Sequence, residues 1–140
     1  MSETLEFVVL GPAQPQGSVR AFMVAGKPRL TSTNAKLKPW RNDVGWAAIA
    51  AKTRMPNGWL PNSEPIELTA RFYFAKPKSA KKRTAPTVKP DIDKLARGLL
   101  DALTGIVFAD DAAVVSLQVE KHYDLPERTE IAVLRKESKS

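Results

Sequence analysis

The stretch IELTARFYFA, which spans Ile66–Ala75, alternates apolar and polar residues along its length. Such alternation is typical of a β-strand with one buried face. Similar patterns predict three more strands and one β-hairpin that has Gly26 near its turn. These segments are Leu5–Gly11, Ala113–Asp124 and Arg128–Lys136 for the strands, and Val19–Thr31 for the hairpin.

Two other segments have the three- and four-residue apolar spacing of helices. The first is predicted to begin at Ala35 or Pro39 and to end at Lys52, with Thr31–Asn34 offering residues suited to an N-cap. The second is predicted over Asp91–Leu103, where the Thr-Gly pair that follows ends it. The two helices and the strands together predict an α+β fold.

We expect this fold to be a mixed, mostly antiparallel sheet of five to six strands with two principal helices, forming a single domain over residues 1–140. The apolar helix faces predict that Trp40 and Trp46 belong to the core, whereas Trp59 lies in a Pro/Gly-rich loop and is harder to assign. Residues 76–90 form a long basic loop, and residues 137–140 are expected to be a frayed tail.

The amino-acid composition excludes several kinds of site and several classes of protein. The chain has 43% hydrophobic residues, enough for a core, and it has no cysteine and one histidine. Disulfides, thiolate zinc sites and a cysteine nucleophile are therefore excluded, and a histidine-based triad is disfavoured. No apolar run is long enough to cross a bilayer, and the N-terminus lacks the pattern of a secretory signal. We therefore expect a protein of the cytoplasm.

Charge indicates an anionic partner. The chain carries 22 Lys+Arg against 15 Asp+Glu, a formal net charge of +7. Many basic proteins merely have solvated basic faces, but here the cations cluster. Eight basic residues and two acids lie between Lys76 and Arg97. A cation run beside carboxylates is what a nuclease needs, because it must bind phosphate and also hold a metal.

The carboxylates are concentrated in KPDIDKLARGLLDALTGIVFADD, Lys89–Asp111, which holds five aspartates. Ionised carboxylates at a helix start suit Mg²⁺, which commonly takes one or two of them together with water and substrate phosphate. A structural interpretation is also open, and the spacing alone favours it. Asp91 could cap the helix, Asp93, Arg97 and Asp101 could form an ion-pair ladder, and Asp110-Asp111 could be turn residues.

The complete sequence of this region favours the metal-site interpretation. KPDIDKLARGLLDALTG followed by FADDAAVVSLQVEKHY resembles the RusA family of Holliday-junction resolvases, and the similarity extends to the opening FVVLGPAQPQGSVRAF and the closing VEKHYDLPERTEIAV. The resemblance implies Mg²⁺-dependent hydrolysis of DNA, with Mn²⁺ a plausible substitute and no small-molecule cofactor. It implies that Asp91, Asp93 and Asp111 are the catalytic metal ligands and that Asp110 is less essential.

This sequence departs from the family pattern at two positions. Arg97 stands where the family has its catalytic lysine, and Lys94 stands where asparagine is usual. Arginine keeps the charge and can bind a phosphate with two hydrogen bonds, although it donates a proton poorly. We therefore expect Arg97 to act by charge stabilisation. The expected DNA contacts are Lys76, Lys81, Lys82, Arg83, Lys89, Lys94 and Lys121.

The expected partner is branched DNA in the form of a four-way junction, bound by a homodimer whose symmetry matches it. Two alternatives stay open: a general Mg²⁺-dependent DNA nuclease, and a binding protein that recognises branched DNA without cutting it. RNA binding has little support because no aromatic RNA-binding motif is present. His122 is expected to be an ordinary surface histidine.

Overall fold

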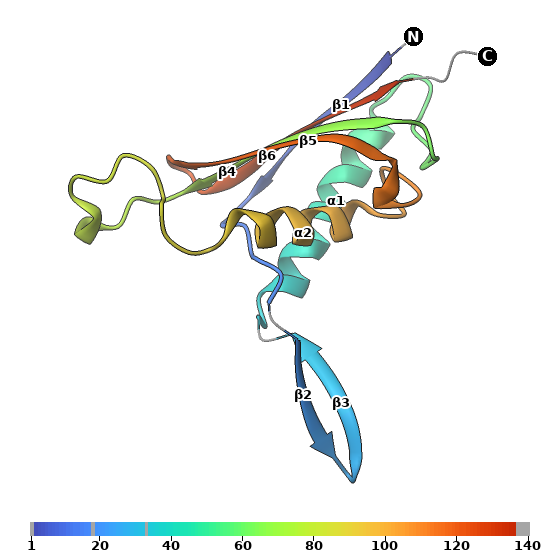
Figure 1. Cartoon of the computed structure of the whole chain (residues 1–140). Helices are drawn as coiled ribbons and strands as arrows, with labels where there is room; N and C mark the ends of the chain where they lie inside the picture. Colours follow the sequence, from blue (N-terminus) through green and yellow to red (C-terminus); the bar gives the residue numbers. More distant parts are fainter. Residues whose placement is uncertain (1, 18, 33, 137–140) are drawn as a thin grey trace.

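The computed structural model describes residues 2–17, 19–32 and 34–136. A four-stranded sheet in the order β1-β6-β4-β5 forms one layer, and the helices α1 and α2 lie on one side of it (Figure 1). The strands of the sheet are β1 (Ser2–Leu10), β4 (Ile66–Phe74), β5 (Val114–Tyr123) and β6 (Arg128–Lys136). The helices are α1 (Leu37–Thr53) and α2 (Ile92–Leu103), and two short 3₁₀ turns are η1 (Lys78–Ala80) and η2 (Asp111–Ala113). The tail at 137–140 lies outside the described residues.

The predicted α+β class is confirmed, with a mixed sheet in which two of the three strand pairings are antiparallel. β1 pairs with β6 and β6 with β4 in antiparallel fashion, whereas β4 and β5 are parallel. The sheet has four strands, fewer than the predicted five to six. The difference arises because β2 (Val19–Val24) and β3 (Lys27–Ser32) pair with each other as a separate hairpin that projects from the rest (Figure 1).

The hairpin turn is made by Ala25 and Gly26, which both have positive φ, 51° and 78°. Two consecutive residues with positive φ are the signature of a turn whose twist matches that of the flanking strands. Gly26 therefore lies where the sequence predicted it.

The core lies between the sheet and the two helices. On β4 the alternation in the sequence becomes alternation in burial, since Ile66, Leu68, Ala70 and Phe72 are buried and face the helices. On α1 the buried face includes Trp40, Val44, Ala48 and Ala51, and on α2 it includes Leu95, Leu99 and Leu103. The prediction for Trp40 is confirmed, at 4% exposure.

The prediction for Trp46 is wrong, because this side chain is 70% exposed. Trp46 follows the buried Val44 by two residues, which rotates it about 200° around an α-helix and away from the core face. The start of α1 also differs in detail. Its N-cap is Lys36, which makes no side-chain capping bond, and the Oδ1 of Asn34 accepts from the Lys36 N–H at 3.1 Å one step before the helix. Within the predicted capping segment, Thr33 lies outside the described residues.

Trp59 belongs to the core, at 3% exposure, and it fastens the loop between α1 and β4. Its indole N–H donates to the main-chain oxygen of Val107 at 2.8 Å. The guanidinium of Arg135 lies 3.8 Å over the centre of its ring and pairs with Glu3 at 3.0 Å. The buried Arg135 charge is thus compensated by a carboxylate and by an aromatic face.

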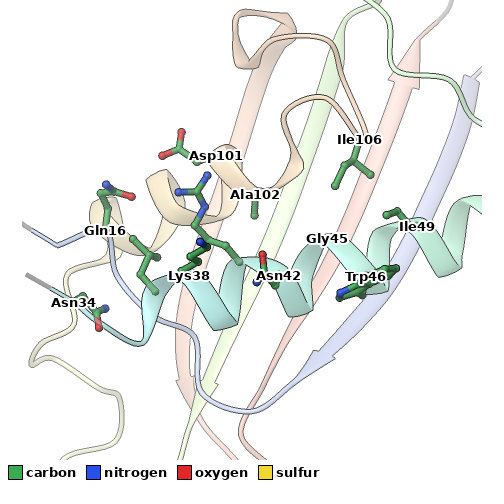
Figure 2. A pocket seen from close by; sticks show the side chains of 12 residues that line it. Gln16, Asn34, Lys38, Asn42, Gly45, Trp46, Ile49, Asp101, Ala102 and Ile106 are labelled. Atoms are coloured by element: carbon green, nitrogen blue, oxygen red, sulfur yellow. The ribbon is translucent and has the colours of Figure 1, made fainter. Parts of the chain in front are cut away.

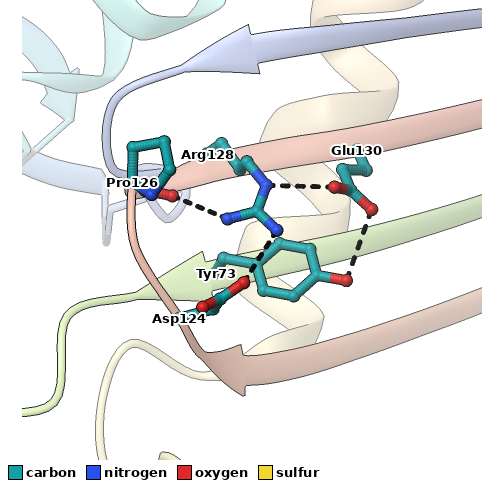
Figure 3. Close-up of polar contacts among 5 residues, drawn as sticks. All are labelled: Tyr73, Asp124, Pro126, Arg128 and Glu130. Carbon is teal, nitrogen blue, oxygen red and sulfur yellow. Dashed lines mark hydrogen bonds and ion pairs between the residues drawn. The ribbon is translucent and has the colours of Figure 1, made fainter.

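The face of the sheet opposite the helices carries a polar network (Figure 3). Arg128 pairs with Asp124 at 2.9 Å and with Glu130 at 3.0 Å, and its guanidinium lies 4.0 Å over the ring of Tyr73. The hydrogen bond from Arg128 lowers the pKa of Asp124, while burial, followed by the charge of Glu130, raises the pKa of Tyr73. No helix in the described part of the chain is long and apolar enough to cross a membrane.

Candidate active site

The parallel pairing of β4 with β5 determines where the acidic residues lie. Parallel neighbours need a crossover connection, and here it consists of the basic loop, residues 76–90, followed by α2. Because Leu95 and Leu99 of α2 pack on the sheet, Asp93 and Arg97 are left exposed on the helix. The chain then returns to the sheet through η2, which begins at Asp111.

Asp93, Arg97 and Asp111 line one hollow of about 420 Å³. The remaining lining residues are mainly apolar and come from α2 and β5: Ile92, Ala96, Leu100, Leu117 and Val119. We call this hollow the acidic hollow. It brings together three of the four predicted catalytic residues, although Asp111 is separated from the other two by most of α2 and the following turn.

Asp91, the fourth of these residues, lines a separate hollow with Lys89, Lys94 and Gln16. It occupies the N-cap position of α2, but its side chain makes no capping hydrogen bond and instead lies 3.8 Å from the ammonium of Lys94. The capping interpretation of its carboxylate therefore does not hold. Within residues 2–17, 19–32 and 34–136, no group of three or more carboxylate, histidine or cysteine side chains is arranged to hold a metal ion.

The ion-pair ladder along α2 is not formed. Among the described residues, no salt bridge joins Arg97 to Asp93 or to Asp101. Asp93 and Arg97 thus both border the acidic hollow without neutralising each other in a close pair. A carboxylate and a guanidinium in this state are available to a cation and to a phosphate, respectively.

The two consecutive aspartates differ in what they do. The carboxylate of Asp110 accepts from the Ala112 N–H at 3.2 Å, so the turn interpretation holds for this residue, and that bond is the first cause of its lowered pKa. A hydrogen bond with Asp110 raises the pKa of Asp111, and the charges of Asp110 and Asp101 act in the same direction. Negative charge is therefore concentrated at Asp111, where a cation would relieve it.

The predicted DNA contacts divide into two groups. Lys81, Lys82 and Lys89 are exposed on the loop or at its end, and Lys76 is exposed while donating to the Lys81 carbonyl oxygen at 3.3 Å. Lys94 is also exposed, beside Asp91. These residues can meet a polyanion without breaking the fold.

Arg83 and Lys121 form the second group, and they fasten the basic loop to β5. Arg83 is half-buried, and its Nε donates to the Tyr123 hydroxyl oxygen at 2.9 Å. The ammonium of Lys121 donates to the carbonyl oxygens of Val88 and Pro90 at 2.8 and 2.9 Å. Lys121 thereby holds the two residues that flank Lys89, immediately before Asp91.

His122 lies on the opposite face of β5 from Lys121 because side chains alternate along a strand. Its ring stacks on Tyr73 with centroids 5.3 Å apart, and its Nε2 lies 2.7 Å from a Glu120 carboxylate oxygen. The hydrogen bond with His122 is also the first cause of the lowered pKa of Glu120. His122 therefore belongs to the polar face of the sheet rather than to the acidic hollow.

Sequence reasoning missed two contacts that position the site. The main-chain N–H of Gln16 donates to the Lys94 carbonyl oxygen at 2.9 Å. This bond attaches the segment between β1 and β2 to the start of α2. Every residue except proline has a main-chain N–H, so the sequence does not indicate which one makes such a bond. The second contact is the hydrogen bond from Arg83 to the Tyr123 hydroxyl oxygen. The sequence could have indicated part of it, because Tyr123 lies two residues from Lys121 and thus on the same face of the strand.

Comparisons with known proteins place the chain in a family. The family model described as "Endodeoxyribonuclease RusA" matches residues 12–134 of the chain. A protein of Bacillus subtilis (strain 168), named "Uncharacterized protein YqaN", is 30% identical over 142 residues, covering 94% of this chain and 96% of that protein. The matched range includes every residue of the acidic hollow and the whole of the basic loop.

Proposed function

The chain belongs to the RusA family of endodeoxyribonucleases, and from this premise we propose that it resolves four-way DNA junctions. In this proposal it is a Mg²⁺-dependent, structure-selective endonuclease that makes paired symmetric nicks during DNA recombination and repair. The observation that carries the proposal is the acidic hollow, which Asp93, Arg97 and Asp111 line together, in a chain whose basic loop carries exposed lysines.

The side chains present suit Mg²⁺. Asp93 and Asp111, which line the acidic hollow, and Asp91, which lines a separate one, would hold the ion, and Mn²⁺ could replace it. Mg²⁺ accepts a site with few protein carboxylates, because water and substrate phosphate complete its octahedral shell. A bound divalent ion supplies charge stabilisation at the phosphate and lowers the pKa of an attacking water.

Arg97 contributes electrostatics directed at the reacting phosphate. Its guanidinium is permanently charged and presents a planar array of donors that matches phosphoryl oxygens. Because no close carboxylate neutralises it within the described chain, this charge is free to offset the negative charge that grows during hydrolysis. The substitution of lysine by arginine thus preserves charge stabilisation.

The flanking DNA would be held by the exposed lysines of the basic loop and of the start of α2. Lys81, Lys82, Lys89 and Lys94 are exposed and would bind phosphates, which would fix the position of the duplex arms without reading their sequence. A junction has two-fold symmetry, and a C₂ dimer of this chain would present two identical sites to it. Paired nicks require such a dimer.

The test is cleavage of a synthetic four-way junction in Mg²⁺, beside a linear duplex of the same sequence. Asp93→Asn is the inactivating variant, and Asp43→Asn, which changes an exposed aspartate outside the acidic hollow, is its matched control. We expect paired nicks in the junction alone, made by the wild type and by the control but not by Asp93→Asn. Cutting of both substrates would mean a general nuclease, and tight binding without cutting would mean a binding protein.

A further inference from the structure

Residues 7–42 carry positive charges and no carboxylate side chain. Between Phe7 and Asn42 there is no aspartate or glutamate, and the cations are Arg20, Lys27, Arg29, Lys36, Lys38 and Arg41. This stretch contains the projecting hairpin and the first turns of α1, which follow one another in space as in sequence (Figure 1). An acid-free basic stretch on a projecting element suits contact with a polyanion.

A groove of about 560 Å³ runs along α1 on the side of α2, and we call it the α1 groove. Lys38, Asn42 and Trp46 follow one another at four-residue intervals along one side of the helix, with Ile49 one turn beyond (Figure 2). Trp46 is 70% exposed and Ile49 is exposed as well. A large aromatic surface left in water, in a groove that Lys38 and Arg41 also line, indicates a partner with both a flat apolar face and negative charge.

The α1 groove is continuous with the hollow that Asp91 lines. Gln16 and Asn34 line both the α1 groove and the hollow that holds Asp91 and Lys94. The hydrogen bond from the Gln16 N–H to the Lys94 carbonyl oxygen fixes this shared wall. A chain of phosphates could therefore pass from Asp91 to Trp46 along one surface.

We propose that the α1 groove binds an unpaired stretch of DNA strand next to the cleavage site, with a nucleobase stacked on Trp46 and phosphates held by Lys38 and Arg41. This inference rests on the proposed function, since it assigns a second contact surface for the same DNA. Every nucleobase has a π-face, so stacking on a tryptophan tolerates any sequence. The polar edge of Asn42 adds a hydrogen-bonding partner beside that base.

Charge favours DNA over a second copy of this chain as the occupant. The groove is lined by two cations and three amide side chains against one carboxylate, Asp101. Lysine is depleted at the centre of protein–protein interfaces, whereas cations beside an exposed aromatic are the usual composition of a surface that tracks single-stranded nucleic acid.

Tryptophan fluorescence provides a direct readout. Trp40 and Trp59 are buried, so Trp46 is the one tryptophan whose emission a solvent-borne base can quench by contact. The wild type would be titrated in Ca²⁺ with a (dT)₁₂ oligonucleotide and with an unlabelled four-way junction. Dissociation constants for a fluorescein-labelled junction would be measured in parallel by anisotropy.

Trp46→Ala should weaken binding of both DNAs by about 5- to 150-fold, the range expected for loss of one stacked base. Trp46→Phe, which keeps an aromatic face, should recover most of the affinity, and Ile49→Ala should change it by less than about threefold. Because Trp46 is exposed, the alanine variant leaves the core intact, which circular dichroism would verify.

Two results would overturn the inference. Binding by Trp46→Ala equal to that of the wild type would do so, as would loss of DNA affinity that sedimentation shows to follow from dissociation of an oligomer. The experiment also separates this inference from the proposed function. A wild type that binds through Trp46 but cuts no junction refutes only the proposed function, whereas a Trp46→Ala variant that both binds and cuts the junction as well as the wild type does refutes only the inference.

Discussion

Replacing Lys121 by methionine should release the segment that positions Asp91. The Lys121 ammonium donates at 2.8 and 2.9 Å to the carbonyl oxygens of Val88 and Pro90, and methionine keeps the length of the side chain but neither bond. Hydrogen bonds to a charged group contribute about 1.5–3 kcal/mol each. Both bonds lie near the surface, where water competes, so we expect a combined loss of about 2 kcal/mol.

That loss should appear as local opening of residues 84–92 rather than as global unfolding. About 2 kcal/mol corresponds to roughly 30-fold faster hydrogen exchange in this segment, measured by mass spectrometry on metal-free protein. Divalent-ion affinity, measured by calorimetry, should fall by up to about tenfold, because Asp91 would have to be ordered again on binding.

Lys82→Met is the matched control. It also removes one positive charge, from the basic loop that Lys121 holds, but Lys82 donates no side-chain hydrogen bond within the part of the chain described here. Exchange in residues 84–92 should therefore be unchanged in the control. Equal exchange in Lys121→Met and the wild type would refute the reasoning, since the two bonds would then contribute nothing to order in this segment.

Three further outcomes follow from contacts elsewhere in the chain. In metal-free protein, Asp110→Asn should lower the pKa of Asp111 toward that of an ordinary aspartate, because it removes the neighbouring carboxylate; an unchanged carbon NMR titration would contradict this. Trp59→Phe leaves a main-chain oxygen without its 2.8 Å donor and should reduce the free energy of unfolding in urea by about 1–3 kcal/mol. Gly98→Ala places a methyl group 3.2 Å from a main-chain oxygen and should destabilise by about 1–3 kcal/mol. Gly45→Ala meets only the tip of a flexible side chain at 3.3 Å and should gain up to about 1 kcal/mol in helix propensity, so equal effects of the two alanines in thermal melts would refute the packing argument.

The elements that sequence reasoning predicted best are those whose burial is periodic. The strand over Arg128–Lys136 was predicted with the bounds that the structure has, and Ile66–Ala75 and Asp91–Leu103 differ from β4 and α2 by one residue each. Local periodicity is enough to define an element because the buried face repeats within the element itself. Where elements pair is not local, and so the separation of the hairpin from the sheet was not predicted.

The site was predictable in its residue types more than in its arrangement. Asp93, Arg97 and Asp111 do share a hollow, which spacing alone could not establish, while Asp91 faces a different one. Trp46 was misplaced because small alanines around it make both faces of α1 apolar. Lys121 was predicted as a DNA contact, yet its ammonium binds carbonyls thirty-odd residues away in sequence, and no local pattern encodes that distance.

The basic loop is attached at both of its ends. A change in its length therefore need not move the site residues that follow it in the chain. β4 fixes where the segment begins, Arg83 attaches it to Tyr123, and Lys121 fixes where it ends, so the tip that carries Lys81 and Lys82 lies between the first two of these anchors. Doubling the length of a flexible loop adds only about 0.6 kcal/mol to its closure cost. Insertions or deletions at this tip are therefore cheap, and they would alter how far the chain reaches along a bound partner without moving a carboxylate. Among chains with this fold, the shape of the bound substrate can therefore change through the loop while the residues of the active site stay the same.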